Sequence, residues 1–175
     1  MIRIPMPNAD EYAPFYAGYV ARLEGGDVRP LLASQALSTA RLLAATDEAK
    51  GLHRYAPGKW SVKETIGHLA DAERIFAYRA LRFARADGTA LPGFDENAYV
   101  PQGRFDARPL AELAAELAAV RAATVTLFEG LPPDALERRG SANHHPVSVR
   151  ALAAIIAGHE KHHVTLLRER YGLSG

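Results

Sequence analysis

The sequence contains no cysteine. Disulfide bonds and thiolate ligands are therefore excluded, and a bound metal ion would need histidine, aspartate or glutamate ligands. No run of about 18 apolar residues is present, so we expect no membrane-spanning helix and no membrane partner. The 21 basic and 20 acidic residues nearly cancel. Because no basic stripe stands out either, we expect no nucleic-acid partner.

Gly-Ser linkers, low-complexity tracts and internal repeats are also lacking. The 175 residues, 48% of them hydrophobic, suffice for one core, and we expect a single domain over residues 1–175. The first residues lack the basic and then apolar character of a signal peptide, so the expected location is the cytoplasm.

Four segments have the apolar spacing of amphipathic helices, and no segment alternates as a strand would. These predicted helices are residues 28–47, 61–85, 106–129 and 148–171. Asp27 is a plausible N-cap for the first helix. Ser61 and Glu64 form a capping-box sequence at the start of the second, and Pro109 suits the first turn of the third.

Helices of about 20 residues are about 30 Å long, and four of them match a four-helix bundle. The predicted fold class is therefore all-α. Two connections are long, over residues 51–60 and 87–105, and long ordered connections often carry function. Residues 8–23 are rich in aromatic side chains and predict a short extra helix at the N-terminus.

The last predicted helix contains His159 and His163, which are four positions apart. Such residues lie one above the other on the same helix face, where a divalent ion can bridge two imidazoles. His162 is rotated by about 100° and should lie on another face. The best third ligand is His68 on the second helix, beside Gly67, which allows close approach. Three imidazoles leave open positions for water or substrate, as in catalytic metal sites.

Residues 159–163 also have the pattern His-Glu-x-x-His of the zincin proteases. The longer form of that pattern requires glycine and histidine where this sequence has Leu166 and Glu169. We therefore reject the protease interpretation. Glu160 is not assigned as a general base, and we expect it at the surface or in contact with a ligand histidine.

Several other residues are candidates for the surroundings of the histidines. Asp71, one turn after His68, would either orient a ligand or be a surface charge. Trp60 would either staple the helix start or line a pocket. Residues 91–99 mix aromatic side chains with carboxylates, as a ligand-orienting wall does. The remaining pocket candidates are Phe94, Asp95, Asn97 and Tyr78. For Tyr78, and for Arg79 or Arg82, spacing does not decide between the cavity and solvent.

Three stretches of the sequence together resemble the DinB-like (DinB/YfiT) superfamily. They are Trp60-Ser61, residues 67–71 (Gly-His-Leu-Ala-Asp) and residues 157–163 (Ala-Gly-His-Glu-Lys-His-His). The resemblance covers nearly the whole chain and includes Ala-Tyr-Arg-Ala-Leu-Arg at residues 77–82. It implies an up-down-down-up four-helix bundle. It also implies that the metal ligands are His68, His159 and His163.

The resemblance implies a metal-dependent hydrolase or thiol S-transferase that activates water, or a low-molecular-weight thiol, toward a small-molecule substrate. Without cysteine, the candidate metals are zinc and nickel first, then iron, cobalt and manganese. The alternative is a non-catalytic bundle that binds a metal or a small ligand. We also expect a homodimer, because residues 12–19 or the alanine-rich third helix offer an apolar face to a second copy.

Overall fold

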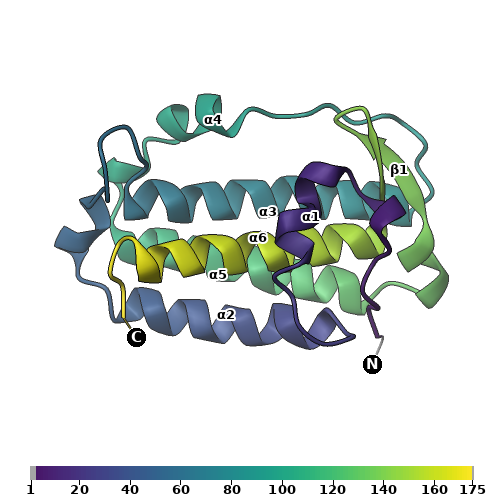
Figure 1. The fold of residues 1–175 in the computed structure, drawn as a ribbon, viewed down its shortest axis with the longest axis horizontal. Coiled ribbons are helices and arrows are strands. Elements are labelled where there is room, and N and C mark those ends of the chain that lie inside the picture. The colour runs from purple at the N-terminus through teal and green to yellow at the C-terminus, as the bar shows by residue number, and fades with distance from the viewer. Residues whose placement is uncertain (1–2, 175) are drawn as a thin grey trace.

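The four predicted helices lie side by side in the computed structural model, which describes residues 3–174 (Figure 1). They are α2 (Arg29–Ala44), α3 (Val62–Ala84), α5 (Leu110–Glu129) and α6 (Val149–Glu169). α2 and α6 run in one direction and α3 and α5 in the other, which is the up-down-down-up order. α3 packs against α5 and α6, and α2 packs against the same two helices. The all-α bundle prediction is confirmed.

Short elements fill the connections between these helices. They are η1 (Ala9–Glu11), η2 (Pro14–Tyr16), α1 (Ala17–Val20), η3 (Glu48–Leu52), α4 (Glu96–Gly103), η4 (Phe105–Ala107), η5 (Pro133–Glu137), β1 (Arg139–Ala142) and β2 (His145–Ser148). The predicted short extra helix at the N-terminus is confirmed as α1, but two 3₁₀ turns precede it, so it covers less of residues 8–23 than expected. The expectation of no strand is wrong, and α4 lies in a predicted connection.

The helix caps agree with the sequence in two places and differ in one. The Ser61 hydroxyl accepts a hydrogen bond from the Glu64 backbone N–H at 3.0 Å, and the Glu64 carboxylate accepts one from the Ser61 N–H at 2.8 Å. Ser148 caps α6. Asp27 is not the N-cap of α2, which begins after Val28. Its carboxylate instead accepts hydrogen bonds from the backbone of both Ile4 and Arg29, and so holds the N-terminal segment against the bundle.

The β-hairpin escaped sequence analysis because its strands have only four residues each. Asn143 and His144, between the strands, both have positive φ, as a two-residue type I′ turn requires. The hairpin also pairs with the connection before α4. The Leu91 N–H donates to the Ser141 carbonyl, and the Asn143 N–H donates to the Leu91 carbonyl. This pairing fixes the chain that continues toward α4.

Two packing contacts place the N-terminal segment beside α6. The buried Glu11 carboxylate accepts hydrogen bonds from Ser148 and Arg150, each at 2.7 Å. α1 then lies against α6, in front of the bundle in Figure 1. Every residue from 151 to 160 is buried, so α6 is the central helix of the core.

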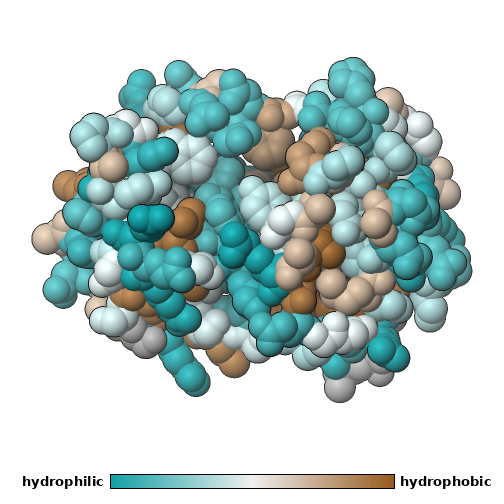
Figure 2. All heavy atoms as spheres, viewed as in Figure 1, coloured by the Kyte–Doolittle hydropathy of each residue, from teal (hydrophilic) through white to brown (hydrophobic). Residues whose placement is uncertain are grey.

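No helix within residues 3–174 has the length and apolarity to cross a membrane. The face in Figure 2 is mostly hydrophilic, with hydrophobic side chains in separate patches.

A buried ion network crosses the bundle. Arg121 of α5 donates two hydrogen bonds, each 2.8 Å long, to the Glu73 carboxylate on α3. It also lies 2.6 Å from the Glu160 carboxylate on α6, which accepts a hydrogen bond from the Thr39 hydroxyl on α2. All four residues are buried. The network thereby joins the four helices, and each buried charge has an opposite charge beside it.

Replacing Arg121 with methionine should strongly destabilise the protein. The change would leave two carboxylates buried without their cation, which costs about 3–5 kcal/mol in the free energy of unfolding. Urea unfolding of the metal-free protein measures the loss. The matched control is Arg74→Met, because Arg74 pairs with Glu116 at the surface and such pairs contribute about 1 kcal/mol or less. Equal losses in the two variants would contradict a structural role for the network.

Candidate metal centre

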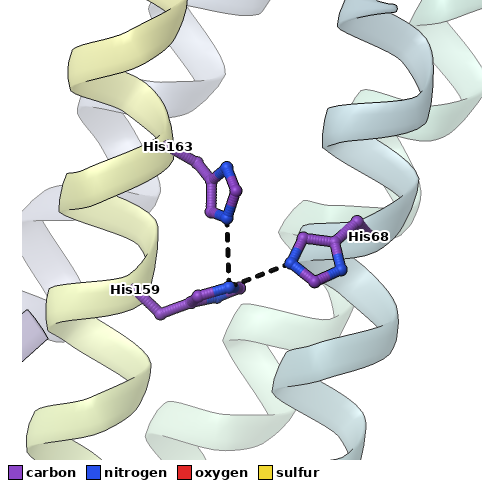
Figure 3. Close-up of side chains that lie close together, drawn as sticks. All are labelled: His68, His159 and His163. Atoms are coloured by element: carbon purple, nitrogen blue, oxygen red, sulfur yellow. Dashed lines mark hydrogen bonds between the residues drawn. The ribbon is translucent and has the colours of Figure 1, made fainter. Parts of the chain in front are cut away.

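Three histidine side chains from two helices converge between α3 and α6 (Figure 3). The Nε2 atom of His159 lies 3.0 Å from Nε2 of His68 and 3.2 Å from Nε2 of His163. All three residues are buried, and their potential ligand atoms lie within 4.8 Å of one another. The structure therefore brings together the three residues that the sequence singled out as ligands.

Two glycines beside these histidines allow their neighbours to approach. A Cβ atom on Gly67 would collide with the Phe105 ring, and one on Gly158 would collide with the Tyr19 carbonyl group. The backbone of α1 can therefore lie directly on α6. The Tyr19 ring then packs edge-on against His159, with 5.2 Å between ring centroids. Small residues next to the ligands thus determine which aromatic groups surround them.

Burial keeps the three imidazoles neutral. It lowers the pKa of His68 to about 4, because a buried site disfavours the charged form. Burial also lowers the pKa of His159 and of His163 well below the usual value, and repulsion from the neighbouring histidines adds to the effect. At neutral pH each ring therefore has a nitrogen with a free lone pair, which is the form that binds metals.

The arrangement of the Nε2 atoms fits a divalent cation. A neutral imidazole nitrogen either donates one hydrogen bond or accepts one. His159 Nε2 faces both of the other Nε2 atoms, so one such bond cannot satisfy all three buried atoms. A cation that accepts three lone pairs would satisfy them together, and imidazole suits zinc, nickel and related metals. That these residues bind a metal remains a prediction.

A cavity of about 370 Å³ adjoins the histidine cluster. Its aromatic lining consists of Phe15, Tyr16, Tyr19, Trp60, Phe76 and Phe94. Polar groups besides the histidines come from Arg79, Glu96 and Asn143. This volume and this largely aromatic wall with a few polar groups are typical of small-molecule sites.

Two of the candidate residues line this cavity. The Trp60 ring lies 4.7 Å from the His68 ring and 6.4 Å from the His163 ring, between centroids. The structure agrees with the interpretation of Trp60 as part of a pocket wall. Phe94 lies 6.3 Å from the Phe76 ring across the cavity. The connection from α3 to α4 therefore supplies part of the wall.

Tyr78 and Glu160 lie away from the cavity. The Tyr78 side chain is 49% exposed, and its hydroxyl accepts a hydrogen bond from Arg82 at the surface. Tyr78 therefore faces solvent, and its interpretation as a residue of this pocket is corrected. Glu160 is neither at the surface nor in the cavity. It belongs to the buried ion network with Arg121, because it points about 100° away from His159 around α6.

Asp71, Asp95 and Asn97 also lie outside the wall of the cavity beside the histidines. Asp71 lies 3.6 Å from Arg74 in a surface ion pair, which agrees with its interpretation as a surface charge. Asp95 caps α4 by accepting a hydrogen bond from the Asn97 backbone N–H at 2.9 Å. Asn97 lines a separate cavity of about 220 Å³, whose wall shares Trp60 and His163 with the larger cavity.

Sequence analysis missed several cavity residues, although a signal existed for some. Ala72 and Phe76 follow His68 at helical intervals of four, so they share its face of α3. Arg79, for which the cavity and solvent were both left open, follows Phe76 by three and lines the cavity. No such signal was available for Tyr19 or Asn143. Their positions depend on the contact of α1 with α6 and on the hairpin, which are long-range features.

The family model of the DinB superfamily matches residues 32–167. The chain belongs to the DinB superfamily. A search of curated proteins found no match.

Two solved structures are similar to the chain in fold. YfiT from Bacillus subtilis, described as a probable metal-dependent hydrolase with an unusual four-helix bundle topology, matches with a TM-score of 0.74 and 16% identity, over 96% of this chain and 94% of its own. The mycothiol-dependent maleylpyruvate isomerase matches with a TM-score of 0.67 and 16% identity, over 85% of this chain but 60% of its own. A mutant of the isomerase matches with a TM-score of 0.65, 17% identity and the same coverage. At these identities the likeness shows the fold alone.

The stability of the metal-free protein should decrease in mild acid. His68 titrates near 6.5 when unfolded but at about 4 when folded, so the unfolded state binds more protons between these values. Stability is therefore highest above 6.5 and falls as the pH decreases toward 4, by up to about 1.4 kcal/mol per pH unit for each such histidine. Urea unfolding across this range measures the slope. A His68→Gln control should show a flatter slope, and an unchanged slope would contradict the burial argument.

Proposed function

We propose that this chain is a metal-dependent enzyme in which His68, His159 and His163 hold one divalent ion beside the substrate cavity. The observation that carries the proposal is the convergence of three buried, neutral imidazoles on a cavity of about 370 Å³. When bound by three imidazoles, such an ion lowers the pKa of water or of a thiol and so supplies a nucleophile at neutral pH.

The chain's own residues prepare this site in two ways. Burial holds the three rings neutral, so their lone pairs are available without loss of a proton. The aromatic walls, with Trp60 beside His68 and Phe76 beside His159, shield one side of the cluster from water. Exclusion of water strengthens the electrostatic interactions of a reacting group with the residues around it.

The proposed reaction is either hydrolysis or the transfer of a low-molecular-weight thiol to an electrophile. Two proteins of the same fold support these two chemistries, because one is described as a probable metal-dependent hydrolase and the other as mycothiol-dependent. The proposed metals are zinc or nickel first, then iron, cobalt or manganese, since imidazole ligands suit them all. Thiol chemistry would fit a cytoplasmic location, where thiols are kept reduced.

Replacing His163 with alanine should remove both metal and activity. Two remaining imidazoles bind a divalent ion much more weakly than three, so the metal content after dialysis should fall from about one ion per chain to a small fraction. Elemental analysis, together with esterase and thiol-transfer screens, measures both. The matched control for the metal content is His162→Ala, because His162 precedes His163 on α6 and lines the same cavity but lies outside the converging set. An unchanged metal content in His163→Ala would refute the site.

The same measurements distinguish the enzyme from the non-catalytic alternative. In both cases a chelator should lower the melting temperature of the native protein, because a metal bound only to the folded state stabilises it. Only the enzyme should also show turnover that disappears in His163→Ala. A large melting shift without turnover in any screen would favour a bundle that binds a metal or a small ligand.

A homodimer is also part of the proposal. An apolar groove of about 550 Å³ runs between α3 and α5, with Tyr78 and Leu81 exposed at 49% and 37%. Small alanine residues of α5 line it and would permit close approach of a second copy. Light scattering should give twice the chain mass, and Leu81→Glu should give a monomer because it places a charge in the groove. A native monomer at high concentration would contradict this part.

A further inference from the structure

Arg79 is a buried cation on the wall of the cavity beside the histidines. It comes from α3, and the residue is 3% exposed. Its Nη2 atom donates a hydrogen bond to the Pro92 carbonyl at 2.7 Å. Its Cζ atom lies 5.8 Å from the ring centroid of Phe76 and 5.9 Å from that of Phe94. The guanidinium is thus held in place by a carbonyl and two aromatic rings.

These contacts do not neutralise its charge. Within residues 3–174, no carboxylate forms an ion pair with Arg79, and Glu96 lines the same cavity without pairing with it. Arg121 is buried to a similar degree but lies against two carboxylates. A buried charge without an opposite charge is costly, so its presence beside a cavity indicates that a ligand supplies the anion.

The chemistry of the guanidinium favours an oxyanion, and a singly charged carboxylate matches the single charge of Arg79. Arginine presents five N–H donors in a planar fork that matches a carboxylate in two parallel hydrogen bonds. The hydroxyl of Tyr16 lies beside it. Burial raises the pKa of Tyr16, and the charge of Arg79 acts in the opposite direction, so the hydroxyl stays a neutral donor at neutral pH. Asn143 adds an amide to the same cavity.

Arg79 is near enough to the histidines for one small molecule to reach both. The Phe76 ring centroid lies 5.8 Å from the guanidinium carbon and 6.0 Å from the centroid of the His159 ring. Because both groups contact the same ring, no more than about twice 6.0 Å separates them. A molecule with a short chain between its carboxylate and its reacting atom would span this separation.

We propose that Arg79 binds a carboxylate of the small molecule that occupies the cavity, and so orients its reacting atom toward the three histidines. This substrate class, a small organic carboxylate, rests on the proposed function for the reaction at the histidines. The binding of the carboxylate itself requires no metal. The carboxylate would belong either to the electrophile or to the thiol that attacks it.

Calorimetric titration of the metal-free protein tests the carboxylate site. The probe is 3-phenylpropanoate, whose ring suits the aromatic wall, and 3-phenylpropanamide is its uncharged counterpart. The native protein should bind the acid at least about tenfold more tightly than the amide. Arg79→Gln should remove this preference, and Arg79→Lys should keep part of it because the charge remains. The matched control is Arg74→Gln, a surface arginine of α3, which should bind like the native protein.

Equal binding of acid and amide by the native protein would overturn the proposal, and this comparison depends on no variant. An acid preference that persists in Arg79→Gln, with its melting temperature close to the native value, would overturn it as well. The outcome is independent of the metal. Failure of the metal site would leave carboxylate binding to the metal-free protein intact, and failure at Arg79 would leave metal binding to the histidines intact.

A second titration assigns the carboxylate to its source. The zinc-loaded protein is titrated with 3-mercaptopropanoate and with 2-mercaptoethanol, which lacks the carboxylate. If Arg79→Gln weakens the binding of 3-mercaptopropanoate but not that of 2-mercaptoethanol, the thiol carries the carboxylate. If it weakens neither thiol while it weakens 3-phenylpropanoate, the carboxylate belongs to the electrophile. If it leaves all three ligands unaffected, the proposal is wrong.

Discussion

The burial of three neutral imidazoles between α3 and α6 is the constraint on which the site depends. An imidazole in a protein interior needs a polar partner, and here the nearest partners are the other two rings. His159 cannot turn outward, because residues 151–160 of α6 are all buried and Gly158 is covered by α1. Core packing therefore fixes the separation of the nitrogen atoms, and a cation is the partner that suits all three.

The same helix, α3, serves both the core and the cavity. Glu73 faces α5 and is neutralised by Arg121, whereas Arg79 faces the cavity and forms no ion pair with a carboxylate of residues 3–174. The two residues are six positions apart, which corresponds to about 120° around the helix. One face of α3 thus contributes Glu73 to the buried ion network, and another presents the charge of Arg79 to the cavity. The contrast is informative, because the protein places an opposite charge beside a buried charge that serves only the fold.

Sequence spacing predicted what lies within one helix, and His68 was named as the third ligand from a second helix. Spacing failed for residues whose position depends on a loop or on the far side of the bundle. The spacing of His159 and His163 placed both on one face, and the capping box placed the start of α3. The same reasoning applied to α3 would have added Phe76 and would have decided between the cavity and solvent for Arg79, since both share the face of His68. It could not have found the burial of Glu160, which depends on Arg121 across the bundle. Nor could it have placed Asn143, which reaches the cavity only because a short hairpin pairs with the connection before α4.

The charges around the cavity also narrow the chemistry. A divalent ion on the histidines and the guanidinium of Arg79 would place two cations near the Phe76 ring, in the wall of one cavity. A neutral ester or amide would interact with the divalent ion and leave the charge of Arg79 uncompensated. A molecule that carries its own carboxylate would satisfy both, since its reacting atom and its anion would meet separate cations. The unpaired arginine therefore favours reactions of small carboxylates over a general esterase activity.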